Sequence, residues 1–196
     1  MAILINNHIV HKILRLLSYD LLVTKKLSGK VYLPALFLVL STEASVLKSL
    51  KTKYPECTIK NSSYFLSKDE KKFLIEKFPT KEIASYYNYY KKSCEKSSHV
   101  FVLSDLVRTH KQFLLFEFEK ENLSQIELLR FLEPKEYMVN KKWYKNFYHK
   151  SPEDINKVDS ISGATLTVSS TKFLSFLSMY LIDKVEKYEK RNKNTN

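Results

Sequence analysis

The spacing of apolar residues changes along the chain and predicts helices first, strands next and a long helix last. Helical spacing indicates helices at 44–53, from Ser67 to just before Pro79, and at 81–93. The second of these has a clear start, because Ser67 and Glu70 form the capping-box pattern ahead of an apolar run. The third contains a cluster of tyrosines, which we expect to pack in the core and at its rim.

The middle of the chain has the period of β-strands, at 100–107, 112–119 and 124–132, and the short connections favour antiparallel neighbours. The second strand is apolar at most positions, which indicates burial on one face and partly on the other. A short helix is expected at 141–149 and a long one at about 168–190. The fold class is therefore α+β: N-terminal helices, an antiparallel sheet of at least three strands, then a turn and a C-terminal helix.

This order divides the chain into four segments. Residues 1–44 are expected to be an export signal, 45–97 a helical N-terminal part, 98–190 the domain core and 191–196 a disordered polar tail. A length of 196 residues suits one domain plus an export segment. Hydrophobic residues make up 44% of the chain, which is enough for a core, so disorder is expected only at the ends.

The expected export signal is carried by residues 25–44. Three lysines precede the apolar run Val31–Leu40, and small residues precede a cleavage point after Ala44. This run is too short to span a bilayer comfortably. An over-extended gene start or an unusually long signal explains the residues ahead of it, and an uncleaved signal anchor is the alternative. In each case the domain is expected to be periplasmic or otherwise extracytoplasmic.

The charge is strongly basic, at +12, and the segment after residue 44 keeps 28 basic and 19 acidic residues, a net +9. A basic chain suggests nucleic-acid binding, but the lysines are scattered, arginines are few and no reader motif is present. We therefore interpret the charge as a solvated lysine-rich surface and expect no nucleic-acid partner. A weak preference for acidic redox partners or anionic lipid headgroups stays open.

Two cysteines, Cys57 and Cys94, lie after the expected signal, and an oxidising compartment would allow them to pair if their geometry permits. The sequence has no Cys-x-x-Cys-His, so no attached haem is expected. His99, His110 and His149 are isolated from one another along the sequence, and no zinc or iron–sulfur spacing occurs. The sequence therefore predicts no metal site.

The segment 159–167, Asp-Ser-Ile-Ser-Gly-Ala-Thr-Leu-Thr, contains one of only two glycines in the chain, Gly163; the other is Gly29. A chain that uses glycine so rarely is expected to need it here for a backbone conformation that other residues resist. A long helical stretch follows directly, and an anion held at a helix N-terminus suits such a turn. The alternative is an ordinary loop in which Thr167 or Ser169 is a hydroxyl N-cap.

Asp159, Ser162, Gly163, Ala164 and Thr165 match, position for position, the pattern Asp-x-x-Ser/Thr-Gly-Ala-Thr/Ser. This pattern resembles the flavinylation signature of the FMN-binding domain family. That family includes the covalent-flavin subunits of sodium-pumping NADH:quinone oxidoreductases and Rnf complexes, and small exported bacterial redox proteins. The resemblance implies that a flavin transferase joins the phosphate of FMN to Thr165 through a phosphoester, while the other four residues form the recognition turn.

The start of the helix belongs to the same candidate site. Main-chain N–H groups around Leu166 and Thr167 are expected to stabilise the negative charge of the phosphodiester. Gly163 and Ala164 leave room for the phosphate to approach the backbone.

A second run supports the resemblance: Phe-Leu-Glu-Pro-Lys-Glu-Tyr at 131–137, followed by Trp143 and Phe147, is similar to a run of small exported members. The likeness covers about residues 98–188. It makes Glu133, Tyr137 and Trp143 candidates for lining the flavin site; the alternative is a Glu-Pro turn and ordinary core aromatics. One departure is the segment 119–122, which replaces a tight glycine turn and is expected to lengthen or stiffen a hairpin.

The resemblance implies an exported flavoprotein that carries electrons through FMN on Thr165, between a membrane or periplasmic donor and an acceptor. We expect a carrier or an oxidoreductase component more than a stand-alone enzyme, so no catalytic residue is assigned. Two alternatives stay open. One is the catalytic subunit of an extracytoplasmic flavin reductase, and the other is a non-redox exported binding module whose turn is never modified.

Overall fold

The centre of the computed structural model, which describes residues 40–193, is a five-stranded antiparallel sheet. Its strands follow one another in chain order, so each pairs with its sequence neighbours and no crossover is needed. This confirms the α+β class and the antiparallel sheet. The strands are β1 (Thr58–Phe65), β2 (Tyr86–Ser93), β3 (Ser97–Leu106), β4 (Lys111–Glu119) and β5 (Asn122–Arg130).

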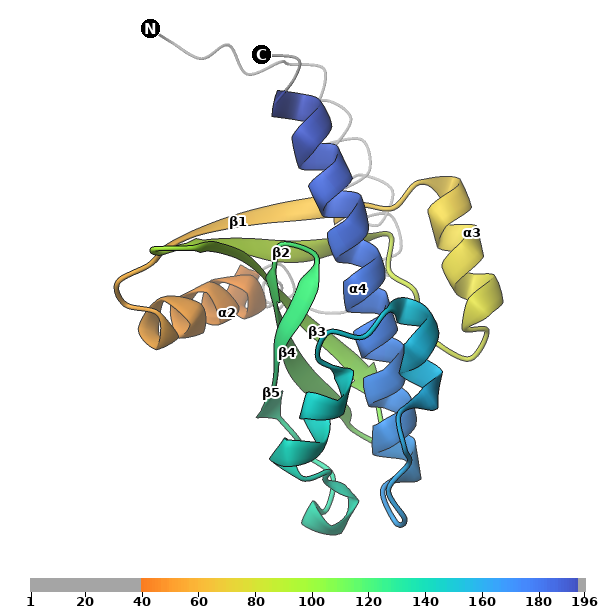
Figure 1. Cartoon of the computed structure of the whole chain (residues 1–196). Coiled ribbons are helices and arrows are strands. Elements are labelled where there is room, and N and C mark those ends of the chain that lie inside the picture. Colours follow the sequence, from red (N-terminus) through yellow and green to blue (C-terminus); the bar gives the residue numbers. More distant parts are fainter. Residues whose placement is uncertain (1–39, 194–196) are drawn as a thin grey trace, which may run out of the picture. The chain divides into compact units, whose positions relative to one another are not determined.

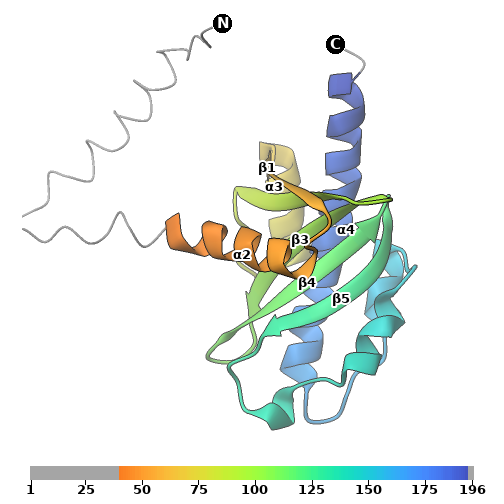
Figure 2. The ribbon, with the colours of Figure 1, turned by 90° about the vertical axis from the view of Figure 1, so that its left-hand side faces the viewer.

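Helices cover both faces of the sheet (Figure 1; Figure 2). The long helix α4 (Thr165–Lys193) crosses one face, while α2 (Leu40–Lys53) lies against the other. Helix α3 (Lys68–Lys77) packs beside α4, where Phe73 stacks on Tyr180 with ring centroids 5.5 Å apart. Three short 3₁₀ helices connect β5 to α4: η1 (Lys135–Tyr137), η2 (Lys141–Phe147) and η3 (Pro152–Lys157).

The alternation of side chains along the strands produces two hydrophobic clusters. On the α4 face the sheet contributes Phe101, Leu114 and Phe116, and α4 contributes its apolar stripe. On the α2 face, Leu50 packs with residues offset by one position from these, namely Tyr90, Val100 and Leu115. Because β4 is covered on both sides, it is buried at most positions, as its continuous apolar run predicts.

The expected helix at 81–93 is wrong: residues 86–93 form strand β2. Aromatic residues favour strands, and here consecutive tyrosines face opposite sides, with Tyr89 in the α4 cluster and Tyr90 in the α2 cluster. The expected helical part at 45–97 is wrong for the same reason, because it contains β1 and β2. Their pairing with β3 makes them part of one sheet with the core.

Two smaller expectations about loops and ends also change. Glu119 pairs with Asn122, so only two residues form the β4–β5 turn, with Lys120 at a φ of 57°; the hairpin is not lengthened. Helix α4 continues to Lys193, so the first half of the expected disordered tail is helical.

The expected export signal lies outside the described residues except for 40–44, which begin α2. Within residues 40–193, no helix is both long enough and apolar enough to cross a membrane.

A disulfide joins Cys57 and Cys94, with their Cα atoms 4.6 Å apart. The two cysteines flank the paired ends of β1 and β2, where Thr58 is opposite Ser93. Strand β1 is a largely exposed edge strand with little apolar surface to hold it. The covalent link therefore holds the end of this strand against its neighbour.

Replacing both cysteines with serine is expected to lower the free energy of unfolding. The bridge closes a loop across a sequence separation of 37, for which the chain-entropy relation gives a loss of about 4 kcal/mol. Urea denaturation of the double variant, followed by circular dichroism, measures this loss. Reducing agent should destabilise the parent protein and leave the variant unchanged; a variant as stable as the oxidised parent would contradict the structural role.

Candidate functional site

The turn before α4 depends on the backbone of Gly163, which has a φ of +82°. A Cβ atom added there would meet no atom within 4 Å, so the requirement for glycine is conformational rather than one of space. The Ala164 N–H donates to the Ile161 carbonyl at 3.1 Å and closes the turn. Ala164 itself is buried, which fixes the end of the turn against the core.

Thr165 is the first residue of α4 and is exposed to solvent. Thr167 is buried instead, and its hydroxyl donates to the Tyr137 carbonyl at 2.6 Å. Both Thr167 and Ser169 lie inside the helix, so neither is its N-cap. The first N–H groups of a helix have no acceptor within it and carry partial positive charge. The exposed hydroxyl of Thr165 therefore stands at an electropositive helix end.

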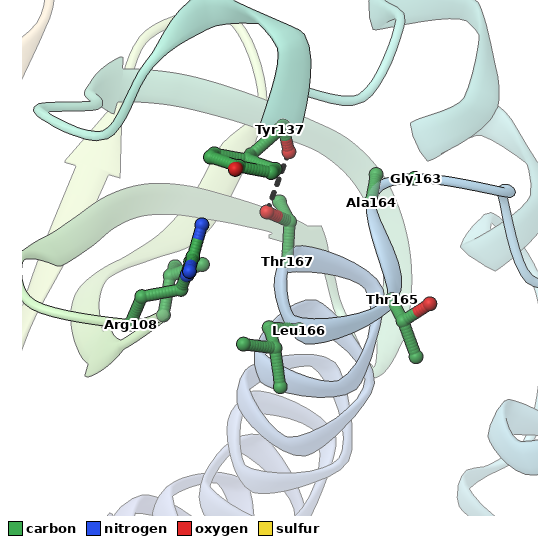
Figure 3. A pocket seen from close by; sticks show the side chains of 8 residues that line it. Arg108, Tyr137, Gly163, Ala164, Thr165, Leu166 and Thr167 are labelled. Carbon is green, nitrogen blue, oxygen red and sulfur yellow. Dashed lines mark hydrogen bonds between the residues drawn. The ribbon is translucent and has the colours of Figure 1, made fainter.

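A cavity of about 220 Å³ opens beside this helix end and is shown in Figure 3. The Arg108 guanidinium lies 4.6 Å from the centre of the Tyr137 ring, a cation–π contact across the cavity wall from Leu166. The Thr165 side chain points away from Arg108 and Tyr137. The lining residues are Val107, Arg108, Tyr137, Gly163, Ala164, Thr165, Leu166 and Thr167.

A second cavity, of about 310 Å³, borders Thr165 from the side of α3 and η3. Its walls combine aromatic surface with three lysines, Lys77, Lys81 and Lys172. Ser160 and Ser169 add hydroxyl groups to the wall near Thr165. Both cavities are at or below the small end of the ~300–1,000 Å³ typical of ligand pockets. Thr165 is thus bordered by two hollows of different chemistry.

Glu133 does not line either cavity; it holds the β3–β4 turn that carries Arg108. One oxygen of its buried carboxylate accepts N–H bonds from His110, Thr109 and Arg108 at 2.8, 2.6 and 3.2 Å. These bonds, led by the one from His110, hold the pKa of the Glu133 carboxyl below its ordinary value. The structure therefore gives Glu133 a different role from the predicted one: it anchors the β3–β4 turn and does not line a cavity.

Trp143 also supports the site from behind. Its indole N–H donates to the Asp159 carbonyl at 3.0 Å, and its ring meets Phe147 edge-on with centroids 4.9 Å apart. Because Trp143 is buried, this contact ties the start of the turn segment to η2. The position of Trp143 is therefore that of an ordinary core aromatic with one hydrogen bond.

The structure thus brings six of the predicted site residues to one cavity: Tyr137, Gly163, Ala164, Thr165, Leu166 and Thr167. Asp159 and Ser162 are exposed on the preceding loop, Glu133 and Trp143 are buried, and none of the four lines this cavity. Sequence reasoning missed Val107 and Arg108. Arg108 left a signal, since it is one of four arginines in a chain with 33 basic residues and follows a predicted strand directly.

The arrangement fits an FMN phosphate in three respects. The Thr165 hydroxyl is accessible, the turn before it has no bulky side chain at Gly163, and the helix end favours negative charge. Searches with this chain found no matching protein-family model, no matching curated protein and no matching solved structure.

Gly163→Ala is expected to destabilise the protein by about 1–2 kcal/mol, because a side chain disfavours the left-handed conformation that this position adopts. Urea denaturation measures the loss. Gly163→Asn is the matched control and should lose less, since asparagine tolerates positive φ better. An alanine variant as stable as the parent would show that the turn readily adopts another conformation.

Glu133→Gln is expected to lower the melting temperature at neutral pH. The pKa of the Glu133 carboxyl is lower in the folded protein than its ordinary value of 4.5, so the ionised carboxylate stabilises the fold at pH values above 4.5. This stabilisation is lost as the pH falls through the lowered pKa. The difference between parent and variant should therefore shrink below pH 4.5. Glu136→Gln, at an exposed neighbouring position, is the control and should show no such pattern. If the difference in melting temperature between parent and Glu133→Gln did not change with pH, the proposed role of the Glu133 carboxylate as an anchor would be refuted.

Proposed function

We propose that this protein is an exported flavoprotein that carries electrons through FMN joined to Thr165 by a phosphoester. The observation that carries the proposal is the exposed hydroxyl of Thr165 at the first residue of α4, two residues after the left-handed Gly163 and between two cavities. The match of the turn to the flavinylation pattern supplies the identity of the cofactor.

The residues of the turn have separate tasks in this proposal. Thr165 provides the oxygen that forms the new bond to phosphorus; its proton and the leaving group of an activated flavin phosphate depart. A flavin transferase supplies that activation. The N–H groups at the start of α4 stabilise the remaining negative charge. Gly163 turns the chain so that Thr165 faces solvent rather than the core.

The bound FMN would supply the redox chemistry, and the protein would supply tethering, orientation and charge. The donor and acceptor belong to the membrane or to the extracytoplasmic space. The Cys57–Cys94 disulfide supports such a location, because structural disulfides persist in oxidising compartments. Permanent attachment also suits this location, since a dissociating cofactor would be diluted there.

A catalytic flavin reductase is the second candidate, and the open cavities beside Thr165 favour keeping it. A reductase needs room next to the flavin for a small oxidant. Steady-state turnover of the loaded protein with candidate acceptors separates the two, because a carrier exchanges electrons with protein partners without transforming a small substrate.

The test is intact mass spectrometry of protein produced together with an active flavin transferase. The parent should gain the mass of FMN less one water, and Thr165→Ala should gain nothing. Thr165→Ser keeps a hydroxyl at the same place and should be modified. An unmodified parent in the presence of an active transferase would overturn the proposal and leave a binding module.

Ser169→Ala is the matched control for this experiment. Ser169 is also an exposed hydroxyl residue of α4 and borders the same lysine-lined cavity as Thr165, but it lies outside the motif. It should be modified as fully as the parent. Loss of the mass gain in Ser169→Ala, with retention in Thr165→Ala, would move the attachment point and contradict the assignment.

A further inference from the structure

Arg108 lies in the turn between β3 and β4 and is held there by two contacts. Its backbone N–H is one of three that donate to the Glu133 carboxylate, and its guanidinium stacks on Tyr137 at 4.6 Å. Tyr137 is held in turn through its carbonyl, which accepts the Thr167 hydroxyl. The first contact holds the backbone of Arg108, and the contact with Tyr137 places its exposed side chain at the wall of the cavity next to the start of α4.

The charge of Arg108 has no acidic partner in the part of the chain that the structure describes. Across residues 40–193, no carboxylate forms an ion pair with the Arg108 guanidinium, which lies over the Tyr137 ring. A guanidinium has five N–H donors arranged for planar, two-oxygen or oxygen–nitrogen acceptors. The helix end beside it has the same sign of charge. An anionic, planar acceptor is therefore the ligand that this wall favours.

The lysines of the other cavity are engaged differently. Lys81 forms an ion pair with Asp105 at 2.5 Å, and the Lys172 ammonium donates to the Asn156 carbonyl at 3.1 Å. Lys77 lies over the Phe176 ring at 4.7 Å. Lys81 is therefore paired with an acid, whereas Lys77 and Lys172, like Arg108, form no ion pair among residues 40–193. Their compact ammonium groups lack the planar fork of donors that the Arg108 guanidinium presents.

We propose that Arg108, stacked on Tyr137, binds the pyrimidine edge of the flavin ring and favours the reduced, anionic state of that ring. The proposal rests on the attachment of FMN to Thr165 and assigns the ring to the Arg108 cavity. The Thr165 side chain points away from Arg108 and Tyr137, so the flexible sugar-alcohol chain between phosphate and ring would have to reach around the end of α4.

The charge balance gives the reason for the effect. Uptake of two electrons and one proton turns the neutral oxidised ring into a reduced ring with one negative charge, located on its pyrimidine edge. A guanidinium beside that edge stabilises the reduced state more than the oxidised one, and so raises the midpoint potential.

The experiment measures the midpoint potential of covalently loaded parent and Arg108→Gln protein, with dithionite as reductant. Loss of the guanidinium is expected to reduce the preference for the reduced ring about tenfold, which lowers the potential of this two-electron couple by about 30 mV. The pH at which the couple changes from two protons to one should move upward in the variant. The ultraviolet–visible spectrum of the reduced protein reports the same ionisation.

Two control variants make the result specific. Arg130→Gln removes a guanidinium that lies 6.0 Å from the Phe113 ring but borders neither cavity beside Thr165, and it should leave the potential unchanged. Lys172→Gln changes the opposite cavity and should also leave it unchanged. A shift in Lys172→Gln without one in Arg108→Gln would place the ring on the other side and overturn the inference.

Mass spectrometry of the same samples separates the two levels of the proposal. A parent that gains FMN mass while Arg108→Gln keeps both its potential and its ionisation behaviour refutes the Arg108 assignment alone. A parent that gains no mass refutes the attachment of FMN and, with it, the assignment. A loaded Arg108→Gln variant that is correctly folded by circular dichroism and has the lowered potential supports both.

Discussion

The burial of α4 against one face of the sheet is the constraint on which the rest of the structure depends. The side of α4 that meets the sheet contains small hydroxyl residues between its large apolar ones, and these allow a close approach at native packing density. Gln112, at the start of β4, donates to the Ser170 hydroxyl at 2.8 Å and the Thr171 hydroxyl at 3.2 Å. The first turns of the helix are therefore fixed relative to the end of the β3–β4 hairpin, and this relation places Thr165 near Arg108.

The candidate site is assembled from segments that are distant in sequence, each held by a contact to the next. Glu133 holds the β3–β4 turn, Thr167 holds the carbonyl of Tyr137, and Trp143 holds that of Asp159. Glu133 and Trp143 do not line the cavity and Thr167 does, but each of the three side chains fixes the position of another part of the site. Buried polar contacts of this kind specify one arrangement, because a displaced partner would leave a desolvated group without a hydrogen bond.

Sequence patterns were informative where local rules decide the structure. The capping box at Ser67 is present with both of its hydrogen bonds, and the three predicted strands, which correspond to β3, β4 and β5, and the long C-terminal helix are confirmed. Strand β1 was missed because it is polar and exposed, so only pairing with β2 and the disulfide define it.

The place of Arg108 beside α4 could not be predicted, since it depends on helix–sheet docking and not on any local period. The motif at 159–165 identified the turn, and only the structure shows that Thr165 is its exposed hydroxyl at a helix end.

The position of the disulfide has a mechanical consequence. A pull on the chain at residue 40 would reach α2 first. That helix packs on the sheet through Leu50, and Tyr54, the residue directly after it, donates its hydroxyl to Glu117 at 2.9 Å. If α2 peeled away, the load would arrive at Cys57 and pass through the covalent bond to Cys94 before it reached the β1–β2 hydrogen bonds at that end. The bond shares the force between two strands and stops β1 from unzipping. Under tension, α2 would therefore unfold and lengthen first, while the sheet kept its strand pairing.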